Sequence, residues 1–288
     1  DQVPREVIPL LFDAFDNGPD RPGPLVWVYP FDEYSELVRG AEPRPDVVFT
    51  EDMFIGECVQ AGVPLNTVVS TGNFRRLMAA RSCCLNSSVL VVPVSAADGA
   101  NMDALERFLG DGGKVLFYGV LQGASERLRS LLRLKCDTAV SGDVAIENRM
   151  AGDLYQGASP AATAHILPQF SCGGLVEVPA DGAALEPCAW AVRGGVRRVA
   201  ALSRTLENGA MVGFVRAILP SAAKVDAGRG FNYGDPAEIY PTPRLMRDLL
   251  AEFGWKIRCL ACNERTQMPR TCICLLYTSP SPRDRTRS

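Results

Sequence analysis

The sequence predicts an α/β fold: a doubly wound, mainly parallel sheet with an antiparallel extension in its second half. Two observations predict the parallel part, namely short apolar runs rich in β-branched residues and segments of helical periodicity that alternate with them. A third observation predicts the extension, because Asn208-Gly209 joins two apolar runs and Asn-Gly is a strong hairpin signal. The chain has 288 residues, enough for one large domain or two small ones.

The first half of the chain alternates predicted strands and helices. Strands are predicted at residues 25–29, 65–70, 88–94 and 114–119, with the sequences LVWVY, LNTVVS, SVLVVPV and KVLFYG. Helices are predicted at residues 50–61, 101–109 and 125–134. For the first of these helices, Thr50 is the expected N-cap, and Glu51 and Asp52 are expected in the first turn. Alternation with short connections implies parallel strands and right-handed crossovers.

The second half of the chain follows a different pattern. Residues 139–187 are rich in Gly, Ala and Pro and contain only two weak apolar runs, at 165–170 and 175–178. Strands are predicted beyond them at 189–192, 199–206 and 210–219, and a helix with one apolar face at 243–253. These segments indicate strands added in antiparallel fashion to the parallel sheet.

The two ends of the chain differ in character from its centre. Residues 1–24 hold one apolar stretch and then a Pro/Gly/Asp cluster, which is typical of a linker or the end of a preceding domain. Residues 25–257 form the predicted domain, and residues 258–273 the predicted start of another. Residues 274–288 begin CLLYTSPSPRD, which resembles a translated sequencing adapter, so we expect a non-native tail. The chain is thus expected to be a fragment of a longer protein.

The composition argues against two classes of partner. The net charge is -3 and the isoelectric point about 5.4, so we expect no attraction to nucleic acid or to an anionic membrane surface. No apolar run approaches the roughly 20 residues that span a bilayer. Neither nucleic acid nor a membrane is therefore a predicted partner.

Ten cysteines are many for a chain of this kind. Six of them are scattered through apolar or strand-like segments: Cys58, Cys83, Cys84, Cys136, Cys172 and Cys188. In a chain long enough to bury a full core, this scatter favours buried free thiols over a disulfide framework. It therefore favours a reducing, cytoplasmic location.

No metal site or cofactor is predicted. Cys259 and Cys262 form a C-x-x-C pair, but a zinc site usually needs a second pair of ligands, and Cys274, which could serve with Cys272, falls in the adapter-like tail. The glycine-rich run at residues 110–113 precedes a strand, whereas a phosphate-binding turn follows a strand and opens a helix.

One family resemblance connects these elements. The SVLVVPV strand, the L-x-x-F-L-x-x-G-G-K-V-L-F-Y-G run at residues 105–119, the hairpin at Asn208-Gly209 and the helix ending in LLAEFG resemble class I glutamine amidotransferase-like domains. They are similar to the version beside the catalytic barrel of glycoside hydrolase family 42 β-galactosidases, where the domain helps to build a trimer. The resemblance covers residues 25–257 and implies a flavodoxin-like fold. Each motif is common by itself, and their order carries the resemblance.

The chain departs from this family at the catalytic turn. True amidotransferases carry a G-x-C-x-G elbow after a central strand, and the corresponding turn here, residues 118–123, has the glycines but no Cys or Ser between them. His165 is the only histidine and has no acidic neighbour within three residues. We expect it to be a partly buried residue hydrogen-bonded to backbone. No catalytic residue is therefore predicted, and glutamine hydrolysis is not expected.

Five polar residues follow predicted strands and could line one edge of the sheet: Asp32, Glu33, Asn73, Asp98 and Gln122. Ligands of open α/β sheets bind where the strands end, and carboxylates near Tyr and Trp suit sugar hydroxyls. The alternative for Asp32 and Glu33 is capping of the next helix or an interdomain contact.

These observations predict a non-catalytic accessory or oligomerisation domain of a multidomain carbohydrate-active protein such as a β-galactosidase-like glycoside hydrolase. The expected partners are further copies of the chain or a neighbouring catalytic domain, which would require an exposed apolar patch, and a carbohydrate is a candidate ligand. The alternative is a small hydrolase or a sugar-binding module that uses the strand-end rim around Asp32 and Glu33.

Overall fold

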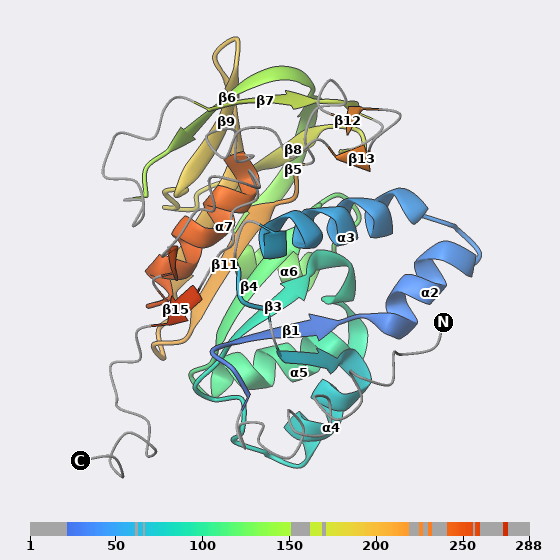
Figure 1. The fold of residues 1–288 in the computed structure, drawn as a ribbon, viewed down its shortest axis with the longest axis vertical. Helices are drawn as coiled ribbons and strands as arrows, with labels where there is room; N and C mark the ends of the chain where they lie inside the picture. Colours follow the sequence, from blue (N-terminus) through green and yellow to red (C-terminus); the bar gives the residue numbers. More distant parts are fainter. Residues whose placement is uncertain are drawn as a thin grey trace, which may run out of the picture.

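The computed structural model describes residues 22–60, 63–65, 67–150, 162–168, 171–218, 225–226, 230–231, 241–255, 257–259 and 273–275. The described residues form six α-helices and one large mixed sheet that is mostly parallel in the first half of the chain. Helices lie on both faces of this sheet (Figure 1). The predicted α/β class is confirmed.

Five strands form the parallel part of the sheet: β1 Leu25–Tyr29, β2 Thr67–Ser70, β3 Val89–Pro93, β4 Lys114–Gly119 and β11 Met211–Arg216. β1 pairs in parallel with β2 and β3, and β4 pairs in parallel with β3 and β11. Every residue of β3 is buried, because helices cover both faces, and its sequence is accordingly apolar without alternation. The predicted parallel strands are confirmed.

The remaining strands are antiparallel: β5 Leu134–Val140, β6 Gly142–Asn148, β7 Ala162–Ile166, β8 Leu175–Pro179, β9 Ala189–Arg193 and β10 Val196–Thr205. The large sheet has the order β2-β1-β3-β4-β11-β10-β9-β6-β7, while β5 and β8 form a separate pair. The predicted hairpin joins β10 to β11, and Gly209 adopts the positive φ of +83° that this turn requires. β5 and β6 were not predicted, because β6 buries only Val144 and Ile146 among exposed or half-buried neighbours.

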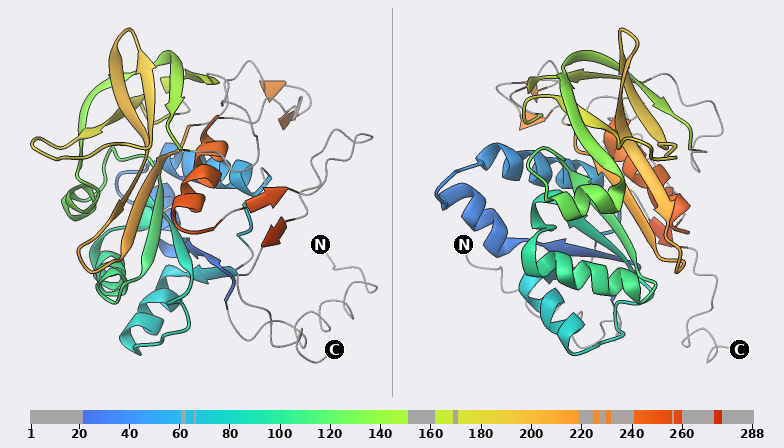
Figure 2. Two further views of the ribbon diagram at one scale, coloured as in Figure 1. Left: turned by 90° about the vertical axis from the view of Figure 1, so that its left-hand side faces the viewer. Right: turned by 180° about the vertical axis from the view of Figure 1, so that it is seen from behind.

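The helices are α2 Phe31–Arg39, α3 Pro45–Gln60, α4 Thr71–Ala79, α5 Gly99–Gly110, α6 Glu126–Leu132 and α7 Pro241–Glu252, with a 3-10 turn η1 at Val94–Ala96. The antiparallel strands gather at one end of the molecule, and α4 and α5 lie at the opposite end (Figure 2). The helices predicted at 101–109, 125–134 and 243–253 correspond to α5, α6 and α7.

The predicted start of the helix at Thr50 is wrong. α3 already begins at Pro45, since proline lacks the N–H that the first helical position leaves unsatisfied, and Asp46 provides the acidic residue of the first turn. Thr50 lies inside the helix, where its hydroxyl donates to the carbonyl of Asp46 at 2.8 Å. Glu51 therefore lies in the middle of α3 rather than in its first turn.

The core consists of one apolar cluster on each face of the sheet. On one face, Phe54 of α3 and Leu249 of α7 pack against Tyr118 and its neighbours. On the other, α4, α5 and α6 pack against the alternate side chains of the same strands, among them Phe117. Alternation of strand side chains between two helical layers thus makes a three-layer fold.

Two short hairpins complete the described chain: β12 Val225–Asp226 with β13 Gly230–Phe231, and β14 Ile257–Cys259 with β15 Ile273–Leu275. β14 spans the predicted boundary between residues 257 and 258, and β15 extends into the adapter-like tail. The domain boundaries and the non-native origin of the tail remain predictions. Cys262 and Cys272 lie outside the described residues.

The six scattered cysteines are all free, as predicted, but not all are buried. Cys58 and Cys172 are buried, whereas Cys83 and Cys84 are exposed on the connection between α4 and β3. The expectation of buried thiols is wrong for those two. None of the described helices is both long and apolar enough to cross a membrane.

Candidate functional site

The turn that follows β4 lies at the edge of the sheet where the parallel strands end. This is the edge at which open α/β sheets bind their ligands. Gly119 ends β4 with a φ of +134°, a backbone conformation that residues with a Cβ rarely adopt. The turn then runs to Gly123, which also has a positive φ, +86°.

Leu121 occupies the middle of this glycine-bearing turn, between Gly119 and Gly123. Its side chain is fully buried in the core beneath α6. Its backbone N–H donates to Oε1 of Glu177 at 3.2 Å. The turn thus holds an apolar side chain at the position where an elbow motif would present a nucleophile.

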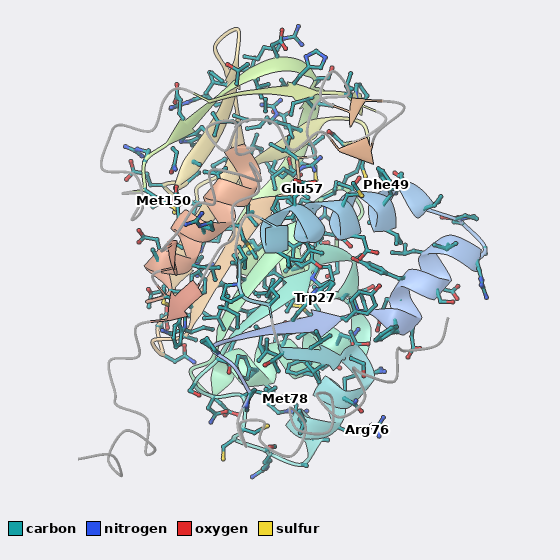
Figure 3. The ribbon with its side chains drawn as sticks, in the orientation of Figure 1. Trp27, Phe49, Glu57, Arg76, Met78 and Met150 are labelled. Atoms are coloured by element: carbon teal, nitrogen blue, oxygen red, sulfur yellow. The ribbon has the colours of Figure 1, made fainter. Side chains whose placement is uncertain are left out.

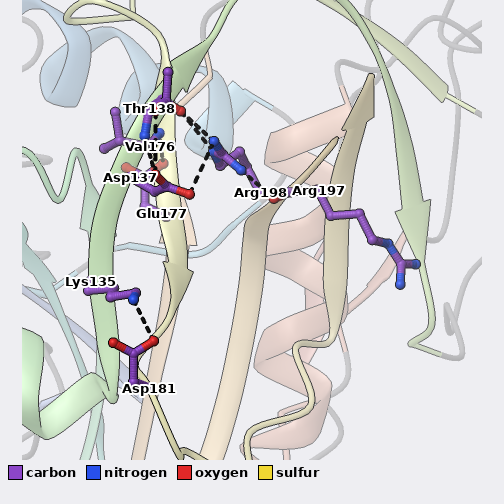
Figure 4. Close-up of polar contacts among 8 residues, drawn as sticks. All are labelled: Lys135, Asp137, Thr138, Val176, Glu177, Asp181, Arg197 and Arg198. Atoms are coloured by element: carbon purple, nitrogen blue, oxygen red, sulfur yellow. Dashed lines mark hydrogen bonds and ion pairs between the residues drawn. The ribbon is translucent and has the colours of Figure 1, made fainter. Parts of the chain in front are cut away.

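Glu177 of β8 and Arg216 of β11 form a fully buried ion pair beside the turn. Both side chains have 0% exposure, and Nε of Arg216 lies 2.7 Å from Oε1 of Glu177. The N–H of Nε is not well aligned with that oxygen, so the contact is chiefly electrostatic. The second carboxylate oxygen accepts from the backbone N–H of Val176 at 2.9 Å, a contact drawn in Figure 4. This pair satisfies the rule that buried charges are compensated.

The guanidinium of Arg216 also holds the loop of residues 171–174. Its terminal nitrogens donate to three carbonyls, those of Ala217 at 2.6 Å and of Ser171 and Gly174 at 2.8 Å each. Glu177 and Arg216 therefore tie β8, β11, the loop and the turn after β4 together. Neither residue was predicted as part of a site.

Cys172 lies in this loop, in contact with the turn. It adopts a φ of +48°, is 7% exposed, and packs against Val47 and Val120. Its Sγ lies 3.5 Å from the hydroxyl of Thr50. Burial raises the pKa of the thiol, so it is protonated at neutral pH and is not an activated nucleophile.

Glu51 of α3 fills the space above Gly119. It is fully buried, and its carboxylate accepts from the backbone N–H of Ser95 at 3.1 Å and from the Ser95 hydroxyl. Burial raises the pKa of Glu51 to about 7, although the hydrogen bonds from Ser95 oppose the shift. A Cβ on Gly119 would lie 2.3 Å from Oε1 of Glu51, so only glycine leaves room for this side chain.

Aromatic side chains close the crevice between β1 and α3. Trp27 of β1 lies on the side of the sheet that α3 covers, and its Nε1 donates to the hydroxyl of Tyr118 at 3.0 Å (Figure 3). Phe54 stacks on Tyr118 with ring centroids 6.0 Å apart. Burial raises the pKa of the Tyr118 and Tyr34 hydroxyls, so neither is an ionised base. The crevice is therefore filled by the protein's own side chains.

Glu33 joins three of the strand-end elements. Its carboxylate accepts from the hydroxyl of Thr71 at 2.9 Å and from the amide of Asn101 at 2.6 Å, which connects the starts of α2, α4 and α5. Asp32 precedes it in the first turn of α2 and is exposed. Both acids lie in the first turn of α2, as the alternative expectation requires, but neither side chain makes a capping hydrogen bond to this helix.

The other predicted rim residues are also at the strand-end edge. Asp98 caps α5 by accepting from the N–H of Gly99 at 2.8 Å. Asn73 is exposed in the first turn of α4, and Gln122 is exposed in the turn after β4. Their role in ligand binding remains a prediction.

His165 lies on β7, the edge strand at the opposite side of the large sheet from β2. The prediction of a partly buried histidine bonded to backbone is wrong, because β6 places Asp143 directly opposite and the two exposed side chains pair through Nδ1 and Oδ1. Within the described ranges, no group of three His, Cys, Asp or Glu side chains is arranged to hold a metal ion.

Comparison with known proteins gives similarity at the level of the fold. No protein-family model and no curated protein sequence matches the chain. A catalytic mutant of a GH42 β-galactosidase from G. stearothermophilus aligns with 83% of this chain at 10% identity and a TM-score of 0.46. A ThuA-like protein from Bacteroides uniformis aligns with 82% of this chain and 92% of its own at 12% identity and a TM-score of 0.44. The chain spans 31% of the length of the β-galactosidase.

Proposed function

We propose that the chain is a non-catalytic, amidotransferase-like accessory domain of a multidomain carbohydrate-active protein, a β-galactosidase-like glycoside hydrolase. Its role is to associate with further copies or with a neighbouring catalytic domain. The observation that carries this proposal is the filled turn after β4. Leu121 occupies its centre, and the buried Glu177–Arg216 pair and Glu51 take the space around it.

The chemistry of the turn supports the absence of amidotransferase activity. An acyl-transfer site needs a nucleophile in contact with a base and a group that orients the base. Among the described residues near the turn, the thiol of Cys172 is protonated, and the carboxylate beside it, that of Asp46, is paired with Arg44. His165 lies on β7, five strands along the sheet from β4, and its side chain pairs with Asp143.

Exposed apolar side chains on α2, α3 and the edge strand β2 support a docking role. Phe31 of α2 is 62% exposed, Phe49 of α3 is 47% exposed, and Val68 of the edge strand β2 is 53% exposed. Exposed large apolar side chains, and an exposed valine on an edge strand, are features of surfaces that another protein covers.

Sedimentation equilibrium of a truncated chain of residues 25–257 tests the docking role. We expect self-association that depends on protein concentration, and weaker association for Val68→Lys, which places a charge on the edge strand. A matched variant, Val196→Lys, changes an exposed valine of β10 and should associate as the parent chain does. A monomer at every concentration would contradict self-association. The remaining form of the docking role would then be contact with a separate catalytic domain, and co-purification of this chain with the catalytic barrel of the parent protein would test that contact.

A sugar-binding module at the rim is the second candidate function. The ring of Phe31 is exposed beside Asp32 and is held by an edge contact with Tyr29 at 4.4 Å between centroids. An aromatic face next to a carboxylate can bind a sugar by stacking and by hydrogen bonding. Titration with galactose should then give saturable binding that Phe31→Ala abolishes and Phe49→Ala leaves intact, and the absence of binding to the parent chain would exclude this candidate.

A further inference from the structure

A hollow of about 640 Å³ lies between the end of α6 and the turn that follows β8, away from the strand-end crevice. Small side chains form part of its lining, namely Ser130, Ala180, Gly182 and Ala183. The backbone N–H of Ala180 donates to the carbonyl of Arg133 at 2.9 Å, which fixes the turn against the end of the helix. The hollow is therefore a depression open to solvent, with part of its wall fixed by this backbone contact.

Basic side chains surround this hollow. Arg129 and Arg133 are four residues apart on α6 and its C-cap, and Lys135 follows on β5. Lys135 is paired with Asp181 through a contact of 2.5 Å, drawn in Figure 4. In the part of the chain that the structure describes, no acid lies within 4.0 Å of either arginine, although Glu126 lines the same hollow. Two guanidinium groups are thus left without a carboxylate partner in a chain whose net charge is -3.

A fourth cation contacts the same helix from β10. Arg204 of β10 is half-buried and donates to the carbonyl of Leu131 at 2.7 Å, which orients it toward the last turn of α6. Burial, and then the charge of Arg133, lower the pKa of Arg204. Arg204 contacts the carbonyl of Leu131, two residues before Arg133, so two positive charges lie at the end of α6, and an anion near them would reduce their repulsion.

The helix dipole accounts for only part of this arrangement. Cations are favoured at a helix C-terminus, which suits Arg129 and Arg133. The helix dipole does not explain why Arg204, which comes from β10, contacts the same end of the helix. Arg133 itself is held in the left-handed region, with φ +54° and ψ +41°, where glycine or asparagine is the usual residue. Its guanidinium is placed at the hollow despite that local strain.

We propose that this hollow is a binding site for a small anion, with Arg129 and Arg133 as the principal ligands and a phosphate or carboxylate group as the part of the ligand that they recognise. Planar guanidinium groups bind both kinds of oxyanion in bidentate fashion. Lys135 and Arg204 increase the local positive potential. The site is independent of the accessory role proposed above, because its lining, which lies past the end of β8, includes neither Glu177 nor Arg216.

Isothermal titration calorimetry of the full chain with inorganic phosphate and with citrate tests this site, against sodium chloride at matched ionic strength. The variants are Arg129→Gln and Arg133→Asn, the latter chosen because asparagine tolerates the left-handed conformation. Arg76→Gln is the control, since Arg76 projects from α4 at a distance from the hollow (Figure 3). Thermal unfolding of each variant without anion establishes that it is folded, and Arg133→Asn should be no less stable than the parent chain because it removes a repulsion.

We expect saturable binding of at least one of the two anions, weakened fivefold or more by each hollow variant and unchanged by Arg76→Gln. Tighter binding of phosphate would assign a phosphorylated ligand, and tighter binding of citrate a polycarboxylate. The proposal is overturned if neither anion binds more than sodium chloride does, or if both folded hollow variants bind as the parent chain does.

Discussion

Glu177 and Glu51 are both fully buried beside the turn that follows β4, and the fold stabilises them in different ways. Glu177 faces the guanidinium of Arg216, so its charge is compensated. Glu51 receives hydrogen bonds from Ser95, and no cation lies within 4.0 Å of it in the described part of the chain. The difference shows that one side of the crevice depends on a permanent ion pair, whereas the other contains a carboxyl group that can take up a proton.

Both acids stabilise the backbone or the packing around the crevice. The ion pair fixes the 171–174 loop and the turn through the carbonyls and N–H groups that it contacts. Glu51 fills the space that the missing Cβ of Gly119 leaves. Neither acid reaches an open surface, so each is expected to affect stability rather than catalysis.

The largest effect is expected from removing one member of the ion pair. Arg216→Met should lower the free energy of unfolding by about 3–5 kcal/mol, because Glu177 would remain buried without its counter-charge. Denaturant unfolding at pH 7 measures this loss, and Arg76→Met on the surface of α4 is the control, with an expected change within about 0.5 kcal/mol. Equal stability of the two variants would show that the pair does not hold the crevice together.

The next effect concerns pH and distinguishes Glu51 from Glu177. The pKa of Glu51 is raised from 4.5 to about 7, so between these values the folded state keeps a proton that the unfolded state loses. Protonation of Glu51 therefore stabilises the folded state fully below pH 4.5. This contribution to the free energy of unfolding falls by up to about 3 kcal/mol as the pH rises to 7, and above pH 7 it changes no further.

Substitution of Glu51 isolates this contribution. Glu51→Gln keeps the size of the side chain and can still bond to Ser95, and it should abolish this part of the pH dependence. The difference in unfolding free energy between the variant and the parent chain, measured from pH 4 to pH 8, is the relevant quantity. Glu42→Gln alters an exposed acid between α2 and α3 and should leave the slope unchanged. If the parent chain and Glu51→Gln showed the same dependence of unfolding free energy on pH, Glu51 would not be the group with the raised pKa.

A smaller effect is expected at the glycine that separates the two acids. Gly119→Ala should destabilise the fold by about 2 kcal/mol, because alanine is strained at a φ of +134° and its Cβ would meet Glu51. Gly110→Ala, in α5 with open space around its Cα, should instead be neutral or stabilising by about 0.5–1 kcal/mol. Thermal unfolding of the two variants compares them directly, and a neutral Gly119→Ala would mean that Glu51 does not occupy this space.

The smallest expected effect is on activity. Leu121→Cys places a thiol in the middle of the turn, yet it should release no ammonia from glutamine above the level of the parent chain, because the carboxylate beside it, that of Glu177, is already engaged by Arg216 and by backbone N–H groups. Measurable turnover by this variant would contradict the non-catalytic assignment of the crevice.

The apolar strands could be predicted from the sequence, but the filled crevice could not. Burial on both faces leaves a continuous apolar pattern, which is why residues 114–119 were predicted with the bounds that β4 has. β6 was missed because an edge region of the sheet buries few side chains. The crevice depends on residues brought together from α3, β8 and β11, which sequence spacing does not relate.

Two of its residues did carry a signal. Arg216 interrupts the apolar strand VGFVRAIL, and Glu177 interrupts LVEVP, and a charge within a buried strand needs a partner. Matching these two residues from the sequence would have required the sheet order. Glu51 was assigned to a first turn, because the helix was expected to begin at Thr50 and not at Pro45.

A double-mutant cycle on Glu177 and Arg216 tests most directly whether the crevice is a structural element. The free energies of unfolding of the parent chain, Glu177→Gln, Arg216→Met and the double variant give the coupling energy between the two side chains. We predict a favourable coupling of at least about 2 kcal/mol, with the double variant more stable than the sum of the single losses implies. Additive losses, or single variants more stable than the parent chain as at a strained active site, would contradict the account.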